Sequence, residues 1–80
     1  MKPRHIVGEK NIIGQKVYSI RMAKNIKQKD FLAKLQTLGM DISATSLSRL
    51  EGQQRLVQDY EVIILAEALE ISPAELLGQD

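Results

Sequence analysis

Apolar residues recur every three or four positions along much of the chain, the spacing that places side chains on one face of an α-helix. Residues 12–24 and 27–38 show this spacing first. Asn25 and Gly39 follow them, and both residue types commonly end helices because they tolerate a left-handed backbone. We therefore predict two helices here, whose apolar positions are Ile13, Val17, Ile20, Phe31, Leu32, Leu35 and Leu38.

A shorter helix is predicted over residues 44–51. Ser43 supplies a hydroxyl that can accept from a first-turn amide, and Gly52 tolerates the conformation just past the last turn. Leu47 and Leu50 form its apolar face. The other side chains are mostly small hydroxyls, which is unusual for a solvated face but suits contacts with base edges in a DNA major groove. These polar residues are Thr45, Ser46, Ser48 and Arg49.

Two further helices are predicted toward the C-terminus. Residues 60–69, capped by Asp59, carry their apolar side chains on one face. Ser72 and Glu75 form a capping box with a proline at the first helical position, which predicts a short final helix that Gly78 ends. The apolar positions of the longer helix are Val62, Leu65, Ala66 and Leu69.

No segment alternates apolar and polar residues with the period of a strand. The expected fold class is therefore all-α, a compact bundle of five helices. We expect Leu56 and Val57, which lie between the third and fourth helices, to pack against the core. Residues 1–11 show no period and are expected to form a flexible basic arm ahead of a single domain over residues 12–80.

The composition is that of a globular domain. The chain has 80 residues, 44% of them hydrophobic, and no cysteine, so disulfides and thiolate metal sites are excluded. No apolar run approaches the roughly 20 residues of a membrane-spanning helix. His5 is the only histidine, which argues against a metal site. We expect a cytoplasmic protein that uses no cofactor and contacts no membrane.

Charge is distributed unevenly between the two halves. Residues 1–40 carry nine Lys or Arg and two acids, a net charge of +7, whereas residues 41–80 carry two Arg and eight acids, a net charge of −6. Lysines can simply keep helix surfaces soluble, so this asymmetry alone leaves two interpretations open. Both arginines of the acidic half, Arg49 and Arg55, lie in or just after the third predicted helix, which favours a nucleic-acid partner.

Four segments in order resemble the phage repressor/Cro-type helix-turn-helix family, also called XRE-like. The resemblance covers residues 12–78. Its segments are Arg21, residues 26–31 (IKQKDF), residues 43–52 (SATSLSRLEG) and residues 64–77 (ILAEALEISPAELL). It implies a lambda-repressor-like bundle whose third helix enters the major groove of double-stranded DNA.

The connection between the second and third helices departs from the family pattern. It is usually a few residues that begin with Gly soon after the position of Leu35, whereas here residues 36–41 intervene before Ile42. We therefore expect an extra turn on the second helix and a longer loop, as in bacterial members with a Leu-Gln-x-Leu-Gly segment. Because of this longer connection, the sequence does not predict the angle between the second and third helices.

The resemblance implies a role for each residue of the site. Arg49 suits guanine, and the short side chains beside it suit thymine methyl groups. Arg21 and Glu51 would form a salt bridge that holds the third helix. The implied base contacts are Ala44, Thr45, Ser48 and Arg49. The implied phosphate contacts are Lys27, Gln28, Lys29, Ser46, Gln53, Gln54 and Arg55.

Plainer roles remain open for several of these residues. Arg49 can contact a phosphate or an acidic side chain near Glu51, and Gln28 can be a solvated first-turn residue. Arg21 and Glu51 can be unrelated surface charges. The basic residues of the arm can follow the duplex, and these are Lys2, Arg4, His5 and Lys10.

The expected function is that of a small bacterial or phage transcriptional regulator, a repressor in its simplest form, bound to an inverted-repeat operator. The resemblance implies a homodimer on DNA, with contacts from the last helix through Leu76 and Leu77. The alternative is that both leucines close the core of a monomer.

A second function remains open, that of a protein-interaction module such as an antitoxin or regulatory subunit that uses the acidic surface of the last two helices. An enzyme is not expected, because the sequence lacks a Gly-rich phosphate loop and a His-based acid/base group. Glu67, Glu70 and Glu75 are spaced as a solvated surface rather than as converging carboxylates.

Overall fold

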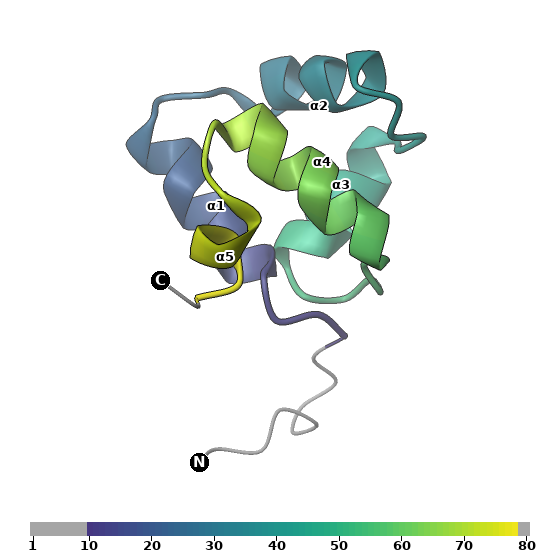
Figure 1. Ribbon diagram of the computed structural model, residues 1–80. Helices are drawn as coiled ribbons and strands as arrows, with labels where there is room; N and C mark the ends of the chain where they lie inside the picture. The colour runs from purple at the N-terminus through teal and green to yellow at the C-terminus, as the bar shows by residue number, and fades with distance from the viewer. Residues whose placement is uncertain (1–9, 79–80) are drawn as a thin grey trace.

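The computed structural model describes residues 10–78, and within that range all regular secondary structure is helical. The helices are α1 (Gly14–Ala23), α2 (Gln28–Thr37), α3 (Ala44–Glu51), α4 (Asp59–Leu69) and α5 (Pro73–Leu76). Figure 1 shows α4 crossing the middle of the molecule, with α2 above it and α1 and α5 to its left. The all-α class and the order of the five helices predicted for this part of the chain are confirmed.

One apolar core joins the helices. α4 contributes Leu65 and Leu69 and packs against α1, α2 and α5. α3 packs against α1 and α2 and buries Leu47 and Leu50, the two residues that helical spacing assigns to its apolar face. Among the apolar positions predicted on the helices, four are only partly buried, namely Ile20, Leu32, Leu38 and Val62.

The connection between α2 and α3 is anchored in the core. Met40 and Ile42, for which no burial was predicted, are both buried. The side-chain amide of Gln36 donates to the Ile42 carbonyl oxygen at 2.9 Å. Gly39 has φ +99°, a conformation that L side chains rarely adopt and that lets the chain turn at the end of α2. The added residues therefore fix the position of α3 against α2 through two buried side chains.

Local signals set the helix ends to within two residues. α1 begins two residues later and ends one residue earlier than predicted, and α2 is one residue shorter at each end. Ser43 Oγ accepts from Ser46 N at 3.1 Å, as predicted. Ser72 Oγ accepts from Glu75 N at 3.0 Å, which is one half of the predicted capping box; the return bond from Ser72 N to the Glu75 carboxylate is not formed. α4 begins one residue earlier than predicted, because Gln58 and not Asp59 is its N-cap residue. The carboxylate of Glu61 accepts from Gln58 N at 2.9 Å, and this hydrogen bond fixes the first turn of α4 to its N-cap residue.

Leu56 contradicts the prediction that it packs against the core. It is 71% exposed, while Val57 is partly buried against the core. Residues 56–58 have no regular secondary structure, and the backbone of Gln58 lies in the β region. Successive side chains of an extended segment point to opposite sides, so only one of the two residues can face inward.

The chain's two ends also differ in part from expectation. Of the two leucines considered for a dimer contact, Leu76 is 1% exposed and belongs to the core, whereas Leu77 is 38% exposed. Asn11, which was assigned to the arm, is buried and bonded to the domain. The rest of the predicted arm, residues 1–9, lies outside the described residues. No described helix combines the length and the apolar character needed to cross a membrane.

Candidate nucleic-acid interface

The four residues expected to contact bases lie together on one side of α3. Thr45, Ser48 and Arg49 are exposed, as is Ala44 at the first helical position, while the opposite side carries the buried Leu47 and Leu50. This division follows from the helical repeat once the leucines are buried. We call Ala44, Thr45, Ser48 and Arg49 the outer face of α3.

Arg21 and Glu51 form an ion pair between the last turns of α1 and α3. Arg21 Nε lies 2.8 Å from Glu51 Oε2, and Arg21 Nη2 lies 3.1 Å from Glu51 Oε1. The two side chains are only 7% and 6% exposed. Arg21 Nη1 also donates to the Ile26 carbonyl oxygen at 2.9 Å. The guanidinium therefore joins α1, the turn before α2 and the end of α3 in one fixed geometry.

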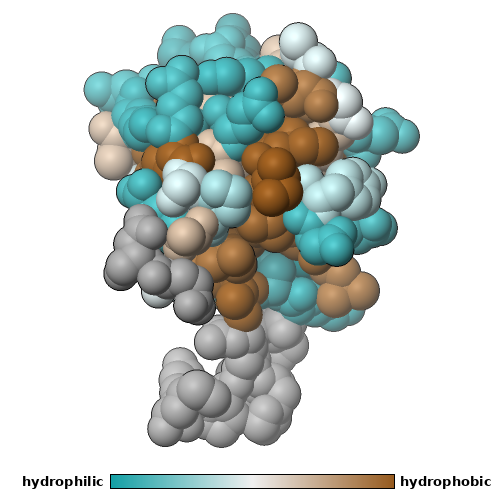
Figure 2. All heavy atoms as spheres, in the orientation of Figure 1, coloured by the Kyte–Doolittle hydropathy of each residue, from teal (hydrophilic) through white to brown (hydrophobic). Residues whose placement is uncertain are grey.

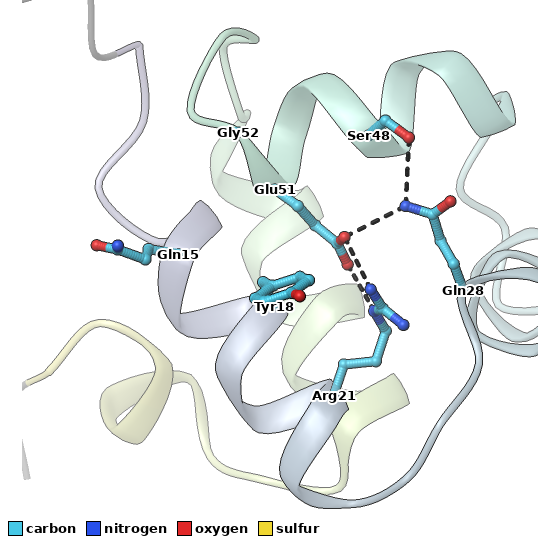
Figure 3. A pocket seen from close by; sticks show the side chains of 7 residues that line it. All are labelled: Gln15, Tyr18, Arg21, Gln28, Ser48, Glu51 and Gly52. Carbon is cyan, nitrogen blue, oxygen red and sulfur yellow. Dashed lines mark hydrogen bonds and ion pairs between the residues drawn. The ribbon is translucent and has the colours of Figure 1, made fainter.

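Gln28, the first residue of α2, binds the same carboxylate. Its Nε2 donates to Glu51 Oε1 at 3.2 Å and to Ser48 Oγ at 3.3 Å. Figure 3 shows Gln28 and Arg21 approaching Glu51 from different helices. Because an amide nitrogen has two hydrogens, both donors of this side chain are engaged inside the protein. We call Arg21, Gln28, Ser48 and Glu51 the bracing network.

At the first turn of α2, the groups open to a ligand are the backbone amides, because the Gln28 side-chain amide is engaged within the protein. No side chain of a described residue caps this turn, whereas Ser43 and Ser72 cap α3 and α5. Lys27 and Lys29 lie exposed beside it. A helix N-terminus with unpaired amides and flanking lysines is suited to a phosphate group.

Arg55 pairs with an acid of α4. Its Nη1 and Nη2 each lie 3.1 Å from an oxygen of Glu61, which is almost fully buried. Burial by itself raises the pKa of Glu61, but the hydrogen bonds from Arg55 and from Gln58 N, with the charge of Arg55, outweigh it and hold the pKa below its ordinary value. The guanidinium expected to contact phosphate is thus engaged within the fold.

Asn11 fastens the start of α1 to the end of α3. Its Oδ1 accepts from Gly14 N at 2.6 Å, and its Nδ2 donates to the carbonyl oxygens of Leu50 and Arg55 at 3.2 and 2.8 Å. Helix α1 approaches so closely that a Cβ at Gly14 would overlap the Leu50 carbonyl oxygen. Sequence reasoning missed Asn11, although an Asn directly before the helix predicted over residues 12–24 is itself a capping signal.

Of the remaining residues expected to contact phosphates, one forms hydrogen bonds within the fold and two are accessible. Gln53, with φ +63°, bonds inward, because its Nε2 donates to the Asn11 carbonyl oxygen at 3.2 Å and its own carbonyl accepts from Lys10 N at 2.9 Å. Gln54 is exposed, and Ser46 is partly exposed in the first turn of α3. Gln53 therefore shapes the loop after α3, while Gln54 and Ser46 remain accessible.

Several cations keep their charge unpaired among the described residues. Lys24 Nζ donates to the Leu69 carbonyl oxygen at 2.7 Å, and Lys34 Nζ lies 3.4 Å from Glu70 Oε2. The exposed cations that form no ion pair with another described residue are Lys10, Lys16, Lys24, Lys27, Lys29 and Arg49. Three of these six, Lys27, Lys29 and Arg49, lie on α3 or at the start of α2.

An open hollow of about 550 Å³ adjoins the bracing network. It lies between α1, the start of α2 and the end of α3 (Figure 3). Its lining residues are Gln15, Tyr18, Arg21, Gln28, Ser48, Glu51 and Gly52. Across residues 10–78, no group of three or more His, Cys, Asp or Glu is arranged to hold a metal ion. Comparisons with protein-family models, curated proteins and solved structures found no match to this chain.

Proposed function

We propose that this protein binds double-stranded DNA sequence-specifically, with the outer face of α3 in the major groove, as a lambda-repressor-like helix-turn-helix transcriptional regulator. The bracing network carries the proposal, because Arg21 and Gln28 hold α3 from two other helices while Thr45 and Arg49 stay exposed. Selective contacts require side chains presented from a rigid element. The arginine can then grip guanine with two hydrogen bonds.

Unpaired positive charge supports a polyanionic ligand. Lys27 and Lys29 flank the uncapped first turn of α2, and Arg49 lies on α3. In the proposed complex, the Gln28 backbone amide and the two lysines contact phosphates, and Ser46 and Gln54 add polar contacts. Gln53 and Arg55 act indirectly, because their side chains bond within the fold. Phosphate contacts of this kind set the position of the protein on the duplex.

We propose that the regulator is a homodimer on an inverted repeat, but not through Leu76, which is buried. The exposed apolar patch consists of Leu56, Tyr60 and Ile63, the last two one turn apart on α4. Figure 2 shows hydrophobic side chains gathered across the face on which α4 lies. In the proposed complex, a second copy seated on this patch pairs two α3 helices on half-sites about one DNA turn apart. Such a dimer acts most simply by covering its operator.

The same patch favours a second candidate function, a protein-interaction module such as an antitoxin or regulatory subunit. The exposed acids Asp59 and Glu67 lie on α4 beside the apolar residues. A basic, partly apolar partner would complement them. This candidate requires neither exposed Arg49 nor the uncapped turn of α2, so DNA binding separates the two.

The test is a selection of bound sequences from a random duplex pool, followed by affinity measurements at several salt concentrations. We expect an enriched inverted repeat and an affinity that falls steeply with salt, since each neutralised phosphate releases counterions. Absence of duplex binding even at low salt would overturn the proposal and favour the interaction module.

A further inference from the structure

Most of the large apolar residues that are exposed on the described chain lie in two groups. One group is the exposed apolar patch on which the proposed dimer forms. The other follows α1, where Tyr18 and Met22 lie one turn apart and are 46% and 51% exposed, and where Ile12 is exposed just before the helix. The second group has no role in the proposed DNA complex or in its dimer.

The two sides of α1 differ from those of an ordinary surface helix. Its buried side carries Arg21 beside Val17, whereas its exposed side carries Tyr18 and Met22. A surface helix is normally apolar toward the core and polar toward solvent, and a helix that is apolar on every side is buried. Figure 1 shows α1 at the left edge of the bundle. The exposed side of α1 therefore has the composition of a surface that a partner covers.

The shape of this side suits a second helix. Tyr18 and Met22 form a ridge at four-residue spacing, and Ser19 and Ala23, both exposed, form a row of small side chains beside it. Such ridges and grooves are the surfaces through which helices pack. The Tyr18 ring is already fixed, because its centroid lies 5.4 Å from Cζ of Arg21 (Figure 3). An aromatic side chain held in this way loses little conformational freedom on binding.

The charge around α1 indicates the chemistry of the partner. Residues 10–29 contain six Lys or Arg and no Asp or Glu. Arg21 is the one among them that forms an ion pair with another described residue. Lys16 is exposed on α1, and Lys27 and Lys29 are exposed after its C-terminal end. An apolar surface bordered by cations is complementary to an apolar seam bordered by carboxylates.

We propose that the exposed side of α1 binds an acidic amphipathic helix of a protein partner. Apolar side chains of that helix cover Tyr18 and Met22, and its carboxylates approach the lysines. A DNA strand would neutralise the lysines but would leave Met22 uncovered. Ser19 interrupts the apolar surface, which distinguishes it from the continuous apolar face of a helix that lies in a lipid surface.

The location of Tyr18 gives the partner a regulatory effect, and this step rests on the proposed function. Tyr18 lines the same hollow as Ser48, which belongs to the outer face of α3. A helix docked over Tyr18 therefore occupies space beside the base-reading surface. The partner and the duplex exclude one another, so the partner releases the regulator from its operator.

The test is a selection from displayed helical peptides of about 20 residues, randomised on one face. We expect enrichment of peptides with Leu, Ile or Phe at one-turn spacing, flanked by Asp or Glu. Met22→Glu should weaken the selected peptide by roughly tenfold, because it replaces an apolar contact with a like charge. Ile63→Glu, an apolar-to-acidic change on α4, should leave peptide binding unchanged. Unchanged urea midpoints check that both variants are folded.

Peptide binding that Met22→Glu leaves intact would overturn the docking site, as would an enriched set without acidic residues. Vesicles of phosphatidylglycerol that bind the wild-type protein but not Met22→Glu, with no peptide enriched, would assign the surface to a membrane and overturn the proposal.

A competition titration tests the regulatory step. The selected peptide should displace the duplex from the wild-type protein, and simultaneous binding of both would refute the exclusion. If the wild-type protein binds no duplex, the proposed function fails, while the peptide selection still decides whether α1 is a docking site.

Discussion

The side-chain amide nitrogen of Gln28 lies 3.3 Å from the hydroxyl oxygen of Ser48, and this contact joins the first turn of α2 to the outer face of α3. The same nitrogen also donates to Glu51, so its direction is set by two acceptors. Ser48 Oγ accepts this bond and keeps its own hydrogen for another partner. Gln28 is thus a positioning residue for Ser48.

A double-mutant cycle tests this coupling. Gln28→Ala and Ser48→Ala should each reduce discrimination between the selected and random duplexes, and the double variant should lose less than the sum, with a coupling of about 0.5–1 kcal/mol. Binding titrations of the four proteins on both duplexes measure it. Strictly additive losses would show that the two residues act independently.

Arg49→Ala should remove base discrimination. We expect a loss of about 1–3 kcal/mol on the selected duplex relative to a random one, the cost of one bidentate guanine contact. Arg49→Lys is the matched control, because it keeps the charge but not the planar fork. Lysine should therefore preserve affinity for random DNA without restoring discrimination. Equal weakening of both duplexes by Arg49→Ala would instead identify a phosphate contact.

Arg21→Ala should destabilise the fold by about 3 kcal/mol, because it leaves the buried carboxylate of Glu51 without its cation. Urea unfolding measures the change. Lys34→Ala is the control, since its pair with Glu70 is exposed and such pairs contribute about 0–1 kcal/mol. Comparable losses in the two variants would contradict the structural role of the buried pair.

Glu61 should make the free energy of unfolding decrease at acidic pH. Its pKa in the folded protein lies below the ordinary value of 4.5, so the ionised form is favoured by folding. The corresponding stability is fully present above the ordinary pKa and is lost as the pH falls through the lower, folded value. Urea unfolding from pH 6 downward should show this decline, and Glu61→Gln should flatten it. A variant with an unchanged pH profile would assign the decline to other carboxylates.

Ile63→Glu tests the proposed dimer contact. A charge in the middle of the exposed apolar patch should abolish tight binding to an inverted repeat and leave only the affinity for a single half-site. Sedimentation and titration on full and half operators measure both effects. Ser19→Glu, which adds the same single negative charge at an exposed position of α1, tests whether charge alone weakens binding. Full-operator binding by Ile63→Glu as a dimer would place the contact elsewhere.

The helix ends and the buried helix faces were predictable, because they depend on residues that are close together in the sequence. α3 begins and ends where expected because Ser43 and Gly52 act within one turn of its ends, and Leu47 and Leu50 set its buried side by spacing alone. The capping serine of α5 and the apolar stripes of α1, α2 and α4 follow from equally local signals. The expected pair of Arg21 and Glu51 is present, but its prediction came from the family resemblance rather than from spacing.

Tertiary structure decided the partners of the long polar side chains. Arg55 meets Glu61 and Gln28 meets Ser48 because helix packing brings together groups 6 and 20 residues apart, and no periodic pattern encodes those distances. The burial of Met40 and Ile42 likewise requires the packed helices, because both side chains belong to the one core that the helices share. The sequence alone determines which helices form and which faces they bury, because caps and periodicity act within a turn or two. Packing determines which polar groups remain free for a ligand, because each pair forms only between elements already held together.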